Sequence, residues 1–271
     1  VVSGDEKYTG KVTIPNEFDC AAGDFTVVAI APKAFAGCKE LTEVSYSSSI
    51  TTIGENAFWG CEKLKNFSIN KGVTFLANSA FENSGIEEIV IPEQVVNIGE
   101  DVFKGCKSLR RAVVENKQIG ENQFSHCVSL ESVTLSDKVS SIKKKAFARC
   151  SSLTSVLIPE NVSKIEEEVF GNCEKLQSAK VLNMTIASKQ FIGCKQLSQI
   201  TLSEALTLIE EKAFSGCVSL TEFRVPANLQ VIRDEAFRNC SGLKIIELGS
   251  SLTHIGEKAF AGCAGVERLV V

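Results

Sequence analysis

Histidine and the motifs of catalysis are scarce in this sequence, and their absence argues against most enzyme chemistry. Only 2 of the 271 residues are His, which leaves little for acid–base catalysis. The chain has no G-x-S-x-G motif and no H-E-x-x-H motif. The stretch from Gly4 to Lys11 has one residue too many for a phosphate-binding loop and lacks its final Ser or Thr. We therefore expect no catalytic residues, no cofactor, no metal and no enzyme activity.

Long apolar runs and an excess of positive charge are also missing. The sequence contains no run of about 18 apolar residues without a charged residue, so we expect no direct membrane insertion of this segment. The formal net charge is −4, from 29 Lys+Arg against 33 Asp+Glu, which disfavours a nucleic-acid partner. The hydrophobic content of 44% excludes a disordered tail. The sequence thus predicts a folded chain that binds neither nucleic acid nor bilayer.

Phenylalanine and cysteine, with 16 and 11 residues, are abundant because both belong to an internal repeat. An aliphatic anchor residue recurs mostly 23 residues apart, and a Phe stands five residues after every anchor. The anchors open coils 1 to 11, in this order: Ile30, Ile53, Leu76, Ile98, Ile119, Ile142, Ile165, Ile186, Ile209, Ile232 and Ile255. The Phe column is Phe35, Phe58, Phe81, Phe103, Phe124, Phe147, Phe170, Phe191, Phe214, Phe237 and Phe260. Such regularity cannot be chance.

Each repeat has two halves with different local preferences. In the second half, Leu153-x-x-Val156-x-Ile158 is typical, and its alternation predicts a short strand with one buried face. The Ala-Phe half predicts one helical or 3₁₀ turn. Because one such coil cannot bury its apolar face alone, neighbouring coils must stack into a solenoid. At about 4.8 Å per parallel strand, eleven coils would extend roughly 50 Å.

The full pattern, Val-x-x-Ile-Gly-x-x-Ala-Phe-x-x-Cys-x-x-Leu-x-x-Val-x-Ile-Pro, closely resembles the BspA-like (treponemal-type) leucine-rich repeat surface protein family. The resemblance covers about residues 26–271. It implies an α/β fold: a right-handed leucine-rich-repeat solenoid of about eleven coils, with a parallel sheet on its concave face. It also implies a surface or secreted protein of bacteria or parasitic protists, often an adhesin for host matrix or other cells.

The ends of the chain differ from the repeats. Residues 1–29 lack the motif, but Lys11–Pro15 and Phe25–Val28 predict two strands around a Gly-containing turn. We expect residues 1–29 to form an N-terminal cap hairpin, since an open solenoid end exposes apolar core. Residues 30–271 are then one continuous leucine-rich repeat domain. The final residues, Leu269-Val270-Val271, lie within an expected strand, which favours a fragment of a longer protein.

A longer period overlies the short one. Residues 98–164 and 165–231 are each 67 residues long and share their irregularities. Gln123 and Gln190, for example, both replace the usual Ala. We infer that a block of three coils was duplicated.

Ten of the eleven cysteines form a second column, which coil 3 interrupts with Ser84. Neighbouring cysteines would lie within disulfide range, but there is no C-x-x-C and no Cys/His grouping with zinc spacing. We predict buried free thiols, with some disulfides as the alternative, and Cys20 as the most exposed cysteine. The column is Cys38, Cys61, Cys106, Cys127, Cys150, Cys173, Cys194, Cys217, Cys240 and Cys263.

Several conspicuous side chains have ordinary explanations. His126 stands where other coils carry Gly or Asn, which share a tolerance of left-handed backbone, so it is a turn residue rather than a catalyst. Arg149 occupies the same column without an evident reason. Lys143–Lys145 and Glu166–Glu168 lie one repeat apart and predict ion pairs between coils, with a basic docking site as the alternative.

The residue between Val and Ile of each strand should point outward from the expected concave sheet. In the middle coils this column is mostly apolar, at Val90, Val113, Thr134 and Leu157, and it is flanked by Glu88 and Arg111. An exposed apolar stripe rimmed by charge predicts a protein-binding site. The alternative is that β-branched residues simply suit exposed strands. Trp59 is a second exposed candidate.

Two classes of function fit these observations. The favoured one is a non-enzymatic binding or adhesion module of a cell-surface or secreted protein. Its partner would be a protein or glycan ligand, such as host matrix or a cell surface, held on the concave sheet face. The alternative is an intracellular structural or scaffold repeat protein that mediates protein–protein interaction, for which unpaired cysteines argue.

Overall fold

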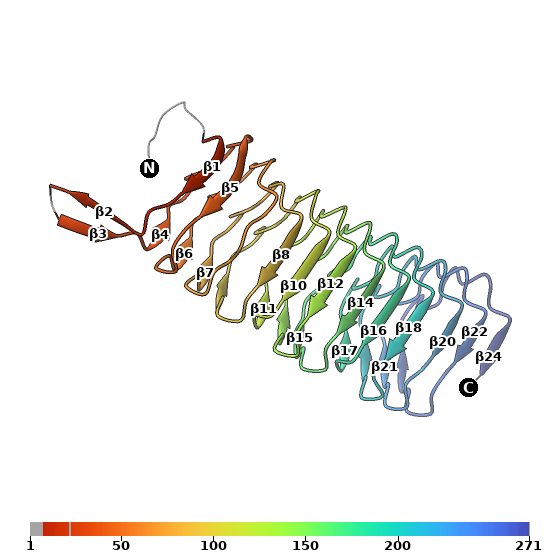
Figure 1. Ribbon diagram of the computed structural model, residues 1–271. Coiled ribbons are helices and arrows are strands. Elements are labelled where there is room, and N and C mark those ends of the chain that lie inside the picture. Colours follow the sequence, from red (N-terminus) through yellow and green to blue (C-terminus); the bar gives the residue numbers. More distant parts are fainter. Residues whose placement is uncertain (1–7, 22, 271) are drawn as a thin grey trace.

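The chain forms one elongated row of stacked coils (Figure 1). The structure, a computed structural model, describes residues 8–21 and 23–270. In these residues the coils consist of strands and turns, and no helix occurs. Accordingly, no helix in the described ranges is long and apolar enough to cross a membrane.

The strands form two parallel ladders along the solenoid. The long strands are β1 (Gly10–Thr13), β5 (Leu41–Ser45), β8 (Glu88–Ile91), β10 (Arg111–Val114), β12 (Ser132–Leu135), β14 (Ser155–Ile158), β16 (Ser178–Val181), β18 (Gln199–Leu202), β20 (Glu222–Arg224), β22 (Ile245–Glu247) and β24 (Arg268–Val270). The two-residue strands are β4 (Ala29–Ile30), β6 (Thr52–Ile53), β7 (Phe75–Leu76), β9 (Asn97–Ile98), β11 (Gln118–Ile119), β13 (Ser141–Ile142), β15 (Lys164–Ile165), β17 (Thr185–Ile186), β19 (Leu208–Ile209), β21 (Val231–Ile232) and β23 (His254–Ile255). We call the outer surface of the long strands the long-strand face.

The first strands of the chain pair differently from one another. β2 (Glu17–Cys20) and β3 (Gly23–Thr26) form an antiparallel hairpin that projects from the end of the solenoid (Figure 1). β1, which contains most of the predicted strand at Lys11–Pro15, instead pairs in parallel with β5 of coil 1. The hairpin is therefore built from residues 17–26, and β1 extends the long-strand ladder by one strand.

The α/β assignment is wrong, because the Ala-Phe half of each coil is a run of turns. Two positions per coil, three and seven residues after the anchor, have left-handed backbone, as at Lys145 (φ 55°) and Arg149 (φ 61°). Helices need consecutive right-handed residues, so this alternation prevents one. The left-handed residues are stabilised by the neighbouring coil: the amides of Lys145, Phe147 and Arg149 donate to carbonyls of coil 7 at 2.8–3.0 Å.

The second left-handed position explains two unusual residues. His126, with φ 61°, is a turn residue as predicted. Arg149 takes the same conformation although its side chain gives no preference for it. The repeat geometry imposes this backbone on whatever residue the coil supplies.

We expect Arg149→Gly to stabilise the protein by about 1 kcal/mol, because a left-handed non-Gly residue carries a conformational cost that Gly avoids. The matched reverse change is Gly60→Ala at φ 67°, where the nearest atom to a new Cβ is 3.9 Å away. That variant should lose a similar free energy of unfolding. Urea unfolding of both proteins measures the effect, and a destabilised Arg149→Gly protein would contradict this explanation.

Stacked phenyl rings fill the core. Phe124, Phe147 and Phe170 are fully buried, with ring centroids 5.2 and 5.3 Å apart and nearly parallel planes. The cysteine column lies beside them, and from Cys61 onward each thiol donates to the carbonyl of the Phe in the preceding coil, as Cys150 Sγ does to Phe124 O at 3.2 Å. The ten column cysteines are free, as predicted, nine of them buried and Cys263 half-buried. The side chain of Cys20 lies outside the described residues.

The irregularities that residues 98–164 and 165–231 have in common also have the same structure in both blocks. In a regular coil, the backbone amide of the residue after the anchor donates a hydrogen bond to the carbonyl of the anchor in the preceding coil. Lys143 N, for example, donates to Ile119 O at 3.1 Å. After the 21-residue coil 4, Gly120 N donates instead to Gln123 Oε1 at 2.6 Å. The corresponding bond after coil 7 joins Ala187 N to Gln190 Oε1 at 2.7 Å. The two-residue ladder is interrupted at both places, so each buried Gln substitutes for a lost backbone hydrogen bond.

Candidate functional site

The six residues predicted to bind a partner lie together on the long-strand face. Val90, Val113 and Thr134 are adjacent in register on β8, β10 and β12, and Leu157 follows on β14. Val90 is 48% and Leu157 45% exposed, whereas Val113 is half-buried. An apolar stripe therefore crosses four successive long strands.

Glu88 and Arg111 border this stripe at one end of the strands. They are register partners on β8 and β10, and both side chains are exposed. Nevertheless, none of the ion pairs among residues 8–21 and 23–270 includes either of them. Neither side chain is therefore held in an ion pair, and a bound partner can pair with both.

A hollow of about 300 Å³ adjoins the stripe. Its lining includes Ser68, Glu88, Val90, Arg111 and Val113, so it shares four residues with the predicted site. Here coil 2 supplies no long strand, and only an isolated bridge joins Asn66 to Glu88. This hollow was not predicted from the sequence.

Two aromatic residues account for the missing strand. Phe67 occupies the inner strand position and packs against Phe58 and Phe81, with ring centroids 5.0 and 4.7 Å away. Tyr46 stacks on Phe67 at 5.5 Å, and its hydroxyl donates to Ser68 O at 2.7 Å and accepts from Asn70 N. Burial raises the pKa of Tyr46 to about 12, so this hydroxyl stays protonated. The Tyr46 hydroxyl bonds the backbone of coil 2 where strand pairing is missing.

A second bulky residue accompanies a similar feature farther along. Phe223 lies at the inner position of β20, 4.3 Å from Phe237, and the ladder is interrupted between β18 and β20. A hollow of about 290 Å³ lies there, lined by Thr201, Glu222 and Arg224 among others. A Phe at the inner strand position is thus the sequence signal that could have located both hollows.

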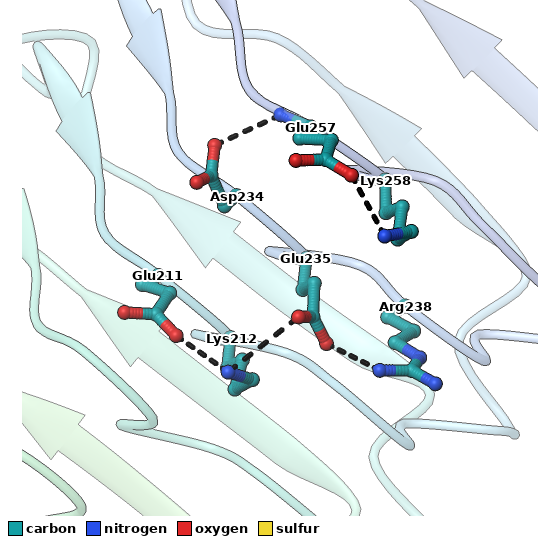
Figure 2. Close-up of polar contacts among 7 residues, drawn as sticks. All are labelled: Glu211, Lys212, Asp234, Glu235, Arg238, Glu257 and Lys258. Atoms are coloured by element: carbon teal, nitrogen blue, oxygen red, sulfur yellow. Dashed lines mark hydrogen bonds and ion pairs between the residues drawn. The ribbon is translucent and has the colours of Figure 1, made fainter.

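Of the three ion pairs predicted between Lys143–Lys145 and Glu166–Glu168, two are confirmed; among the described residues Lys143 has no ion pair, and Glu166 pairs with Lys164. Lys144 contacts Glu167 at 2.5 Å and Lys145 contacts Glu168 at 3.7 Å. Figure 2 shows a similar group farther along, in which Lys212 lies between Glu211 and Glu235, and Arg238 pairs with Glu235 at 2.6 Å. Because Lys144 and Lys145 have carboxylate partners, nothing favours the basic docking site over ion pairs between coils.

These pairs make stability depend on pH. The hydrogen bond from Lys144 holds the pKa of Glu167 below its usual range, aided by the charges of Lys144, Lys189 and Lys145. A carboxyl with a lowered folded-state pKa stabilises above its unfolded-state pKa and loses that effect as the pH falls through the folded value. We therefore expect the unfolding free energy of the wild type to fall more between about pH 5 and pH 3 than that of Glu167→Gln.

Urea unfolding at several pH values tests this expectation. Glu160→Gln, an exposed position outside the ion pairs of the described residues, is the control. Parallel curves for wild type and Glu167→Gln would contradict the expectation.

The remaining candidates do not form a site. Trp59 is 43% exposed on a turn segment. His126 Nδ1 and Ser125 Oγ are 2.9 Å apart, and burial, with Arg149 and Lys104, lowers the pKa of His126. Within residues 8–21 and 23–270, no three His, Cys, Asp or Glu side chains gather as a metal ion would require.

The repeat of this chain matches a known protein family. The family described as BspA type leucine rich repeat region (6 copies) matches residues 28–117, 76–186 and 182–271. No curated protein matches the chain.

Several solved structures share the fold. A leucine-rich repeat protein from Bacteroides ovatus is 23% identical, with a TM-score of 0.53 over 97% of this chain and 89% of that one. A leucine-rich cell surface protein from Faecalibacterium prausnitzii is 24% identical, with a TM-score of 0.53 over 98% and 88%. The pneumococcal vaccine antigen PcpA is 21% identical, with a TM-score of 0.58 over 99% of this chain and 73% of that one. At these identities the likeness shows the fold alone.

Proposed function

This chain belongs to the BspA-type leucine-rich repeat family, and from that premise we propose that it is the binding module of a cell-surface or secreted protein. It engages a protein partner through the long-strand face, with an adhesive role. The observation that carries the proposal is the exposed stripe of Val90, Val113, Thr134 and Leu157 beside the unpaired charges of Glu88 and Arg111. Apolar contact supplies affinity there, and the two charges supply orientation.

The repeat design supports a binding role. The anchor, Phe and Cys columns pack between coils, whereas the column between the two inner strand residues varies from coil to coil. It runs through Ser45, Ser68, Val90, Val113, Thr134, Leu157, Lys180, Thr201, Arg224, Glu247 and Val270. A rigid row of variable outward residues is how repeat proteins build extended binding surfaces.

Free cysteines do not argue strongly for the intracellular alternative. Burial raises the pKa of the Cys61 and Cys173 thiols to about 12, and oxidation proceeds through an accessible thiolate. Thiols that are buried and protonated resist oxidation in an extracellular compartment as well. A secreted location is therefore compatible with the column.

The test is a binding screen of purified protein against immobilised extracellular-matrix proteins and a glycan array. We expect saturable binding to a protein target and its loss in Val113→Glu, because a carboxylate in the middle of the apolar stripe loses its hydration when the partner covers it. Thermal unfolding of Val113→Glu should remain close to that of the wild type.

The control is Val96→Glu, at a 68% exposed valine outside the long strands, which should bind normally. Unaltered binding by Val113→Glu would exclude this face. Binding to glycans alone would contradict the proposed partner class.

A further inference from the structure

The hairpin of β2 and β3 presents two chemically different faces. Phe18 and Phe25 are register partners on one face, with ring centroids 5.6 Å apart, and are 50% and 43% exposed. Since side chains alternate along a strand, Glu17, Asp19 and Asp24 point to the other face. An exposed aromatic pair and an acidic surface therefore share one projecting element (Figure 1).

An apolar cavity of about 430 Å³ lies between this hairpin and the first coil. Phe18 lines it from the hairpin, Val12 and Ile14 line it from β1 and the residue that follows, and Ile30 and Phe35 line it from coil 1. Its volume and apolar lining fit several aliphatic or aromatic side chains. The Phe18 face of the hairpin borders this cavity.

The charges on the hairpin select a cationic occupant. Asp19 and Asp24 are directly opposite each other in the register, an arrangement in which like charges repel. No Lys or Arg occurs between Lys11 and Lys33, and no ion pair among the described residues includes Glu17, Asp19 or Asp24. A cation from a partner would relieve this repulsion. A second copy that met it hairpin to hairpin would bring three more carboxylates and increase the repulsion.

We propose that the cap hairpin and its cavity form a docking site for a basic amphipathic peptide segment of a partner protein. Apolar side chains of the segment enter the cavity and cover Phe18 and Phe25, while its Lys or Arg side chains reach Glu17, Asp19 and Asp24 around the hairpin edge. This site is separate from the long-strand face and does not depend on the function proposed above.

The probe is a fluorescently labelled peptide of about ten residues in which Leu and Lys alternate, with binding followed by fluorescence anisotropy. Phe18→Ser/Phe25→Ser and Asp19→Asn/Asp24→Asn should each weaken its binding about tenfold or more, and the second variant should also reduce the salt dependence. Because all four side chains are exposed, thermal unfolding of the solenoid should be unchanged. Val96→Ser and Glu160→Gln are controls outside the hairpin that should bind as the wild type does.

Two comparison peptides make the result decisive. A peptide alternating Ser and Lys, or one alternating Leu and Glu, should bind far more weakly than the Leu/Lys peptide. Equal binding of the Ser/Lys peptide, or undiminished binding by Phe18→Ser/Phe25→Ser, would overturn the proposal. Self-association of the wild type that this double variant abolishes would assign the surface to a second copy and would also overturn it.

Discussion

Phe147→Ala is expected to lower the free energy of unfolding by about 3–5 kcal/mol. Phe147 is fully buried in the middle of the solenoid, and its ring stacks on Phe124 and Phe170 at 5.2 and 5.3 Å. Truncation removes the apolar transfer energy and leaves a cavity between two rings that are held by their own coils. Because repeats contact only their neighbours, the loss weakens both interfaces of coil 6.

Urea unfolding followed by circular dichroism measures this effect. The matched control is Phe25→Ala, which removes a 43% exposed ring and should change the unfolding free energy by less than about 0.5 kcal/mol. A loss below about 1 kcal/mol for Phe147→Ala would contradict the stacked-core account.

Gly85→Ala should destabilise the protein by roughly 2–3 kcal/mol, because the new methyl group overlaps the backbone of the preceding coil. A Cβ at Gly85 would lie 2.0 Å from Glu62 O and 2.7 Å from Glu62 C. Gly85 lies in a shortened corner, because coil 3 has 22 residues, with one fewer than usual between Ser84 and Ile86. In this corner Gly85 N donates to Cys61 O of coil 2 at 2.9 Å.

Restoring the coil length provides a sharp control. Insertion of one residue between Ser84 and Gly85 gives the 23-residue spacing of most coils, and in that background Gly85→Ala should cost much less. Equal losses in the two backgrounds would show that coil length is not the cause.

The repeat columns were predictable because each is fixed by a requirement that recurs every 23 residues. The Phe and Cys columns become stacks of rings and thiols for that reason. The turn half was not predictable, because Lys145 and Glu168 have no intrinsic preference for left-handed backbone. Hydrogen bonds to the next coil impose that conformation, and single-coil propensities do not contain this information.

The candidate surface was predictable as a column of outward residues but not as a shape. The placement of Val90 and Val113 follows from strand alternation. The hollow beside them depends on Phe67 and Tyr46, whose size displaces a strand that the repeat pattern otherwise specifies. Likewise, the pairing of β1 with β5 depends on a long-range contact that the hairpin pattern does not indicate.

The central claim is that stacking uses the repeated columns and binding uses the long-strand face. Hydrogen–deuterium exchange of the chain, alone and bound to the protein target found in the screen, tests it most directly. The account predicts added protection in β8, β10, β12 and β14, at residues 88–91, 111–114, 132–135 and 155–158. Protection confined to the turn columns, with these four strands unchanged, would contradict it.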